Sequence, residues 1–150
     1  MSLKQWAADG WLKAHKTSPQ EIGNLPSIVR CDLADAGQEG LSADWRFGIA
    51  YHAALKLCAI LLYAEGYMPE KTLAHYRTIQ ALPVILGQEF KDDADYLNAC
   101  RSKRNVSEYE SAGGVTHGDA GELIGFTVEL EAKVMEWLRA KHRDLLAKAS

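Results

Sequence analysis

Apolar residues recur three and four positions apart along most of the chain, which is the spacing of one face of an α-helix. The strongest case runs from Phe47 to Tyr63, where two apolar stripes leave only Arg46, His52 and Lys56 on a polar side. A helix this apolar is buried from more than one direction. We therefore expect it either at the centre of a helical bundle or in contact with a partner subunit.

An earlier helix is expected to begin at Ser18, which can cap it, with Pro19 in the first helical position. Glu21 stands where it would complete a capping box with Ser18. Because proline lacks an amide hydrogen and clashes with the preceding turn, Pro26 is expected to interrupt or restart this helix. The helix is expected to end at Gly37.

Caps, glycines and prolines also bound the other helices. The chain to about Lys16 contains Trp6 and Trp11, and a short helix there is expected to pack its indoles on the rest. Pro83 weakens the prediction for the later half of one helix. The remaining helices are expected from Ser42 to Gly66, from about Leu73 to Leu86 with Gly87 closing it, from Asp92 or Asp93 to Gly113-Gly114, and from about Asp119 to Leu146.

These elements predict an all-α fold, an antiparallel bundle of four to five helices that forms a single domain over residues 1–150. No stretch shows the alternation of a β-strand. The final helix, at roughly 28 residues, would be about 40 Å long. A length of 150 residues is enough to bury a core without metals or disulfides.

Charge and cysteine content limit the binding partners, the cross-links and the cellular location that we expect. The formal net charge of -3 gives no basic field over the whole molecule, so contact with nucleic acid needs a local basic patch. Cys31, Cys58 and Cys100 have no CxxC spacing, which argues against a disulfide framework or a zinc knuckle. The start of the chain lacks the long apolar stretch of a signal peptide. The longest apolar run, near residues 57–63, is too short to span a bilayer, and a cytoplasmic protein without membrane contact is expected.

One helical segment concentrates candidate chemistry. On a helix, Arg101, Asn105 and Glu108 share a face, Arg104 borders it, and Lys103 adds a further positive charge. Two guanidiniums offer planar donors that suit phosphate, and an amide beside them can orient an oxygen. Glu108 can hold Arg104 in place or exchange a proton. The plainer alternative is that Arg104 and Glu108 form an exposed ion pair that contributes little.

This segment resembles the signature helix of the HEPN superfamily, a nucleotide-binding domain of higher eukaryotes and prokaryotes. The similarity lies in the pattern Arg-x-x-Arg-Asn-x-x-x-Tyr from Arg101 to Tyr109. Stretches 44–55, 63–67 and 75–78 also resemble successive parts of bacterial members, in the expected order. The resemblance covers about residues 25–140.

The resemblance implies a bundle of four or five helices that usually dimerises. It also implies possible metal-independent ribonuclease activity, from an Arg followed after four to six residues by a His, with two copies meeting across a dimer. Carried over, Arg104 matches the Arg and Asn105 the polar residue after it, whereas Tyr109 stands where the His would be. A phenol with a pKa of about 10 is a poor general base at neutral pH.

Three functions remain open. The leading one is a dimeric HEPN-like module that binds nucleotide, RNA or a protein partner, with weak or absent catalysis. The second is a metal-independent ribonuclease toxin countered by a nucleotidyltransferase-like antitoxin. The third is a purely structural helical dimer. The candidate catalytic residues are Arg104, Asn105 and Tyr109, and the candidate ligand-binding residues are Arg101, Lys103, Arg104, Asn105 and Glu108.

The histidines show no metal-ligand spacing, so neither a metal nor another cofactor is expected. His117 follows a Gly-Gly pair and could fold back toward Arg104 as a replacement proton carrier. His75 and His52 are expected to be surface or core histidines, with His52 lining the buried face or a subunit contact.

Overall fold

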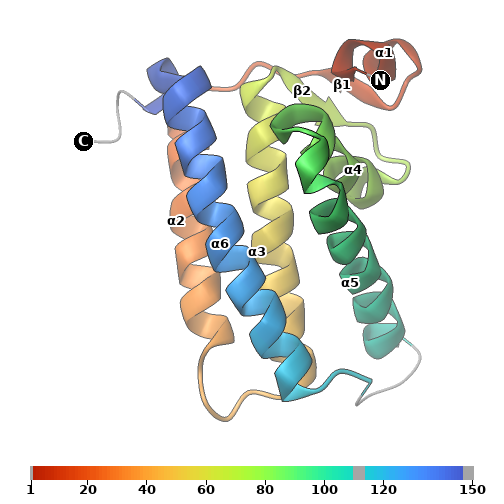
Figure 1. Ribbon diagram of the computed structural model, residues 1–150, viewed down its shortest axis with the longest axis vertical. Coiled ribbons are helices and arrows are strands. Elements are labelled where there is room, and N and C mark those ends of the chain that lie inside the picture. Colours follow the sequence, from red (N-terminus) through yellow and green to blue (C-terminus); the bar gives the residue numbers. More distant parts are fainter. Residues whose placement is uncertain (1, 110–113, 147–150) are drawn as a thin grey trace.

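The computed structural model describes the backbone of residues 2–109 and 114–146, and the side chains of these residues except 106–109. Within this part the protein is an all-α bundle with one small sheet (Figure 1), which confirms the predicted fold class. The α-helices are α1 (Leu3–Ala8), α2 (Pro19–Ala36), α3 (Ala43–Ala64), α4 (Ala74–Leu86), α5 (Lys91–Tyr109) and α6 (His117–Lys141). The strands are β1 (Leu12–Ala14) and β2 (Tyr67–Pro69), and 3₁₀ turns span Gln88–Phe90 and Arg143–Leu146.

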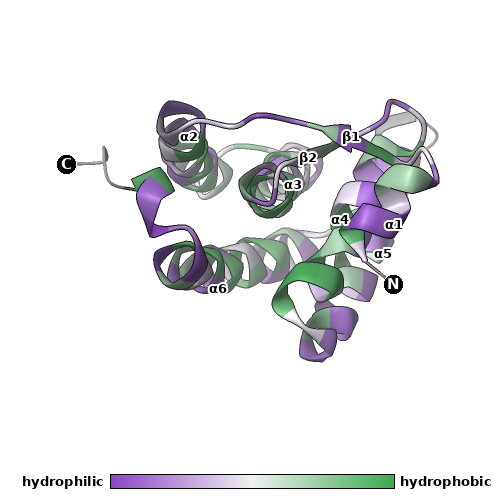
Figure 2. Cartoon of the chain, turned by 90° about the horizontal axis from the view of Figure 1, so that it is seen from above, coloured by the Kyte–Doolittle hydropathy of each residue, from purple (hydrophilic) through white to green (hydrophobic). Residues whose placement is uncertain are grey.

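Helix α3 runs through the centre of the bundle, as its apolar sequence predicted. Seen from above, α2 lies on one side of α3, α4 and α5 on the other, and α6 below (Figure 2). Ser42 caps α3, its Oγ accepting a hydrogen bond of 3.1 Å from the Trp45 amide. The buried side chains of α3 are Phe47, Ala50, Tyr51, Ala53, Ala54, Leu57, Cys58, Ile60, Leu61 and Leu62.

By length and composition, α3 is the one helix of the described residues that could cross a membrane. An 18-residue window within it has a mean hydropathy of 1.6, and 56% of that window is buried inside the protein. The expectation for the run near residues 57–63 counted only uninterrupted apolar residues, whereas this criterion applies to the whole length of α3. Contacts with helices on three sides give a physical reason for the apolar surface of α3.

Helix α2 begins and ends as predicted but continues through Pro26. The Ser18 Oγ accepts a hydrogen bond of 3.1 Å from the Glu21 amide, and Gly37 caps the other end. The expected interruption at Pro26 was wrong: proline removes one amide donor, and burial of its ring in the bundle offsets the loss. The Glu21 carboxylate contacts Thr17 and His15, at 2.6 and 2.8 Å, rather than closing a capping box.

Helix α4 ends at Leu86 as predicted, whereas helix α6 differs from prediction at both ends. Helix α4 passes through Pro83 to Leu86, so its later half is helical. Helix α6 begins before the expected Asp119, because Thr116 caps it in a reciprocal capping box with Asp119. It ends at Lys141, and the expected last turns to Leu146 form a separate 3₁₀ turn after the backbone of His142 leaves the helical region.

The two-stranded sheet was not predicted from the sequence. Strands β1 and β2 pair antiparallel, with Leu12 opposite Pro69. Three residues per strand are too few to show alternation, so the pairing depends on tertiary contacts. The expected packing of the indoles is confirmed: Trp6 is buried, and its ring centroid lies 5.7 Å from that of Trp11. The Arg77 guanidinium lies over the ring of Trp11, 3.6 Å from its centroid.

Candidate functional site

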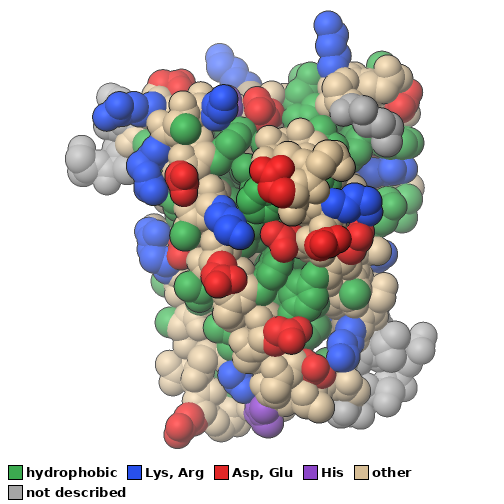
Figure 3. Space-filling view, viewed as in Figure 1, with side chains coloured by type: hydrophobic (Ala, Val, Ile, Leu, Met, Phe, Trp, Pro, Cys, Tyr) green, Lys and Arg blue, Asp and Glu red, His purple; other side chains and the backbone are tan. Residues whose placement is uncertain are grey.

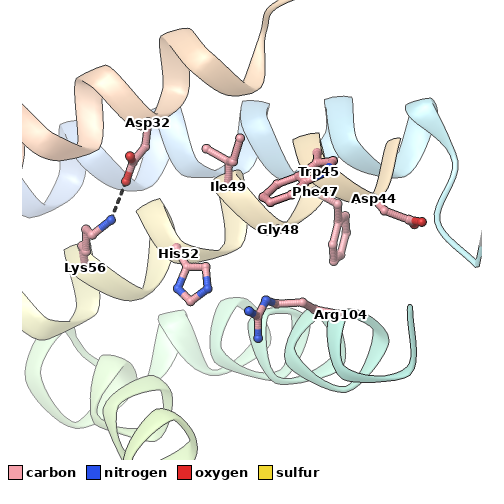
Figure 4. Close-up of a pocket in the computed structure, with 9 residues that line it drawn as sticks. All are labelled: Asp32, Asp44, Trp45, Phe47, Gly48, Ile49, His52, Lys56 and Arg104. Carbon is pink, nitrogen blue, oxygen red and sulfur yellow. Dashed lines mark hydrogen bonds and ion pairs between the residues drawn. The ribbon is translucent and has the colours of Figure 1, made fainter. Parts of the chain in front are cut away.

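One face of α3 is left uncovered by the helices around it and forms the floor of a pocket. Trp45, Gly48, Ile49, His52 and Lys56 follow one another at spacings of one, three and four, so they lie along this face. Asp32 of α2 borders one side of the pocket, and Arg104 of α5 borders the other. Its volume is about 470 Å³. In Figure 4, α6 lies behind α3, so the pocket opens on the face opposite α6.

The ends of this pocket differ in chemistry. At one end the Lys56 ammonium donates to the Asp32 carboxylate at 2.6 Å (Figure 4). At the other end Trp45 and Phe47 supply aromatic surface, and Trp45 is 68% exposed. Between these ends the guanidinium of Arg104 points toward His52. The pocket therefore places a cation and an imidazole between an aromatic end and an ion pair.

A second pocket, of about 330 Å³, lies between the start of α4 and helix α5. Arg101 and Asn105 line it from α5, one helical turn apart, as their spacing predicted. The Arg101 Nε donates to Asn98 Oδ1 at 3.0 Å, and its guanidinium carbon lies 5.7 Å from the ring centroid of Tyr76. The other lining residues are Lys71, Leu73, Ala74, His75 and Tyr76.

Two histidines line the same two pockets as these arginines. His52, from α3, lines the first pocket, and His75, from α4, lines the second. Their ring centroids are 6.3 Å apart and the rings are nearly perpendicular, at 88°. The buried Tyr51 hydroxyl lies 3.4 Å from Nδ1 of His75, and Arg104 lies 5.7 Å from the Tyr51 ring centroid. The histidine pair therefore connects the two pockets.

Burial and positive charge shift the proton equilibria of this cluster. The pKa of His52 is lowered from 6.5, first by burial and then by Arg104, Lys56 and His75, with a smaller opposing effect of Asp32. The pKa of His75 is also lowered, by burial and then by Arg104 and Arg101. Both imidazoles are therefore predominantly neutral at pH 7.

The phenol next to the histidines responds to burial in the opposite direction. Burial raises the pKa of Tyr51 to about 12, although Arg101 and Arg104 act to lower it. The Tyr51 hydroxyl therefore keeps its proton at neutral pH. It can donate that proton in a hydrogen bond to an unprotonated Nδ1 of His75.

Not every residue of the predicted segment reaches the pockets. Arg101, Arg104 and Asn105 do, whereas the Lys103 ammonium pairs with the Asp119 carboxylate of α6 at 3.0 Å. The side chains of Glu108 and Tyr109 lie outside the described residues, so their predicted roles stay predictions. The segment is helical, as predicted, and α5 directs its cations to different sides.

Sequence reasoning assigned no chemistry to His52 and His75. They are 23 residues apart, and only the packing of α4 beside α3 brings their rings together. The one available signal was the polar side that His52 and Lys56 keep on an otherwise apolar helix. His117, the proposed replacement, contacts Arg46 instead, with its Nδ1 2.9 Å from Nη1.

No protein-family model matches the chain, and comparison with curated proteins and solved structures finds no match. Among the described residues, no group of three or more His, Cys, Asp or Glu side chains could hold a metal ion. Two guanidiniums, an amide and two neutral imidazoles suit an oxyanion such as a phosphate.

Proposed function

We propose that the protein is a HEPN-like module that binds the phosphates of RNA or of a nucleotide where its two pockets meet. The observation that carries this proposal is that Arg101 and Arg104, one helical turn apart on α5, each line a pocket together with one histidine of the His52–His75 pair. Guanidinium groups bind phosphate oxygens in a planar, bidentate geometry. A neutral imidazole adds a further hydrogen-bond donor.

Local charge supports this location better than the charge of the whole chain. The net charge is -3, and the face that carries α6 shows acidic and basic side chains intermixed (Figure 3). Such a surface gives no broad attraction to a polyanion. The pockets gather four basic side chains, Arg101, Arg104, Lys56 and Lys71, and two acidic ones, Asp44 and Asp32, of which Asp32 is paired to Lys56. A phosphate would therefore be attracted locally.

The aromatic end of the first pocket supports binding of a nucleobase. A volume of 470 Å³ lies within the range of about 300–1,000 Å³ that small-ligand pockets occupy. Trp45 lines this pocket and is 68% exposed, so its ring is accessible to a ligand. Bases stack on aromatic side chains with little regard to sequence. We therefore propose that a base stacks on Trp45 while its phosphate lies near Arg104.

Binding of a short fluorescein-labelled single-stranded RNA, followed by fluorescence anisotropy over a series of salt concentrations, tests this proposal. Arg104→Ala should weaken binding and reduce the slope of log affinity against log salt by about 0.7. Arg139→Ala, at an exposed arginine in the last turn of α6, is the matched control and should bind as wild type. Absence of salt-sensitive RNA binding by the wild-type protein would contradict the proposal.

The exposure of Trp45 also favours a second candidate, a structural homodimer in which this surface packs against another copy. Size-exclusion chromatography with light scattering at several concentrations separates the two. Under the binding proposal, Trp45→Ala should reduce RNA affinity by about 1–3 kcal/mol. A variant that loses dimerisation but keeps its RNA affinity would favour the structural dimer. A nucleotidyltransferase-like antitoxin remains a proposed partner only through the resemblance to HEPN proteins.

A further inference from the structure

A row of aromatic and basic side chains in alternation runs from the second pocket to the first residues of the chain. Its members, in order, are Arg101 of α5, Tyr76 and Arg77 of α4, and Trp11 before β1. The guanidinium carbons of Arg101 and Arg77 each lie 5.7 Å from the ring centroid of Tyr76, and that of Arg77 lies 3.6 Å from the ring centroid of Trp11. All four side chains are partly exposed to solvent. We call this set the aromatic–arginine row.

The far end of the row is held rigidly. The Trp11 amide donates to the carbonyl of Trp6 at 2.9 Å, and the Trp11 carbonyl accepts from the amide of Glu70 at 3.0 Å. The ring of Trp6 is buried and lies 5.7 Å from that of Trp11. Figures 1 and 2 show α1 and β1 beside α4. The indole of Trp11 is therefore a fixed support for the Arg77 guanidinium.

Both arginines of the row keep donors for a ligand. Within the described residues neither forms an ion pair: Arg101 Nε donates to Asn98 Oδ1, and the Arg77 guanidinium interacts with the two aromatic rings. Glu70, which follows β2, pairs with Lys13 instead, at 3.9 Å. An aromatic face orients a guanidinium while leaving its N–H groups free to bind an anion. The row therefore presents oriented positive charge that no carboxylate neutralises.

We propose that the aromatic–arginine row is a second binding site for single-stranded RNA, over which a strand continues outward from the second pocket. The inference rests on the proposed function and adds the length of the ligand, a strand of several nucleotides rather than a mononucleotide. Bases of single strands stack on aromatic rings and on guanidinium planes, and arginine binds the phosphates between them. A strand alternates bases with phosphates, and the row alternates rings with guanidiniums. A base would stack on Tyr76, with the next phosphate at Arg77.

This site depends on residues that the resemblance to HEPN proteins does not include. The resemblance covers about residues 25–140, whereas Trp11 and β1 precede it. Arg77 is the residue through which these first residues contact the row, and it lines neither pocket. Its substitution therefore separates binding along the row from binding in the pockets.

The test compares a mononucleotide with an octanucleotide of the same base as competitors of the fluorescein-labelled RNA. The wild-type protein should bind the octanucleotide more tightly. Arg77→Ala should lower the octanucleotide affinity by about fivefold or more, reduce its salt slope by about 0.7, and leave the mononucleotide affinity unchanged. Lys133→Ala, at a cation that lies over the Phe90 ring elsewhere on the surface, is the matched control and should bind both as wild type.

Arg77 also joins the first residues to α4, so the wild-type protein supplies a second measurement that needs no variant. An octanucleotide that carries thiouridine is crosslinked by ultraviolet light, and the modified peptides are mapped. Crosslinks should appear in the peptides that contain Trp11 and Tyr76. Crosslinks confined to α3 and α5 would overturn the inference.

The remaining outcomes contradict different statements. Equal affinity for the mononucleotide and the octanucleotide overturns the extended site and leaves the proposed function standing. Displacement of the RNA by a polyglutamate peptide of equal charge, at the same concentration as the octanucleotide, overturns the inference in favour of an acidic peptide as the partner. Absence of salt-sensitive binding by either ribonucleotide contradicts the proposed function itself.

Discussion

Burial lowers the pKa of both His52 and His75, and the charge of nearby arginines lowers it further. Both effects oppose protonation of the imidazoles. In the unfolded chain each imidazole has its ordinary pKa of 6.5, so the unfolded state binds more protons below that pH. Their contribution to stability is complete above pH 6.5. It is lost as the pH falls from 6.5 through the lowered folded-state values.

The free energy of unfolding should therefore decrease as the pH is lowered below 6.5, and part of that slope should belong to this pair. Urea denaturation at a series of pH values measures it. A double variant, His52→Gln with His75→Gln, should show a shallower slope than wild type because glutamine does not titrate. Equal slopes in the two proteins would mean that these histidines keep ordinary pKa values in the folded state.

Half of the site followed from the sequence and half did not. Arg101 and Asn105 are one turn apart in any helix, so their common face was predictable from spacing alone. Lys103 was expected to join them, but at this position the helix faces α6 and the ammonium pairs with Asp119. The approach of His52 to His75 depends on how α3 and α4 pack, and local periodicity carries no information about that packing.

At the scale of elements, a glycine inside a helix lowers the stability of the folded protein relative to alanine. A Cβ added at Gly125, on an exposed position of α6, would meet no atom within 4 Å. Glycine in a helix interior costs about 0.5–1 kcal/mol relative to alanine. Gly125→Ala should therefore raise the free energy of unfolding by about that amount, as measured by urea denaturation.

Gly87, between α4 and the following 3₁₀ turn, is the contrasting case. Its φ is 120°, and an added Cβ would lie 2.6 Å from Oε2 of Glu89. Gly87→Ala should destabilise the protein because alanine rarely adopts this backbone conformation. If both alanine variants shifted stability in the same direction, the difference between these two backbone environments would be contradicted.

Capping residues predicted the ends of helices correctly, whereas prolines did not predict breaks within them. Ser18, Ser42 and Gly37 bound helices where expected, because capping is a local interaction between near neighbours in sequence. Pro26 and Pro83 did not break their helices, because packing against the bundle maintains the helix through the lost hydrogen bond. The short pairing of β1 with β2 joins segments more than fifty residues apart and left no local pattern.

At the scale of the molecule, the all-α architecture follows from helical periodicity, and the location of the site follows from an incomplete bundle. Helices α2, α4, α5 and α6 pack around α3 and leave part of its surface as the floor of the first pocket. That face carries Trp45, His52 and Lys56, and α5 brings Arg104 to its edge. The proposed ligand would therefore cover the part of α3 that the other helices leave exposed.

The most direct test of RNA binding at the histidine pair is an NMR titration of the five histidine imidazoles, with and without the single-stranded RNA of the anisotropy assay. A phosphate bound beside His52 and His75 favours their protonated forms, so the pKa of both should rise when the oligonucleotide binds. The imidazole signals of His142, which contacts Glu65 and lines neither pocket, should not move when the oligonucleotide binds. Binding that leaves His52 and His75 unchanged, or that shifts only the other histidines, would contradict the proposed site.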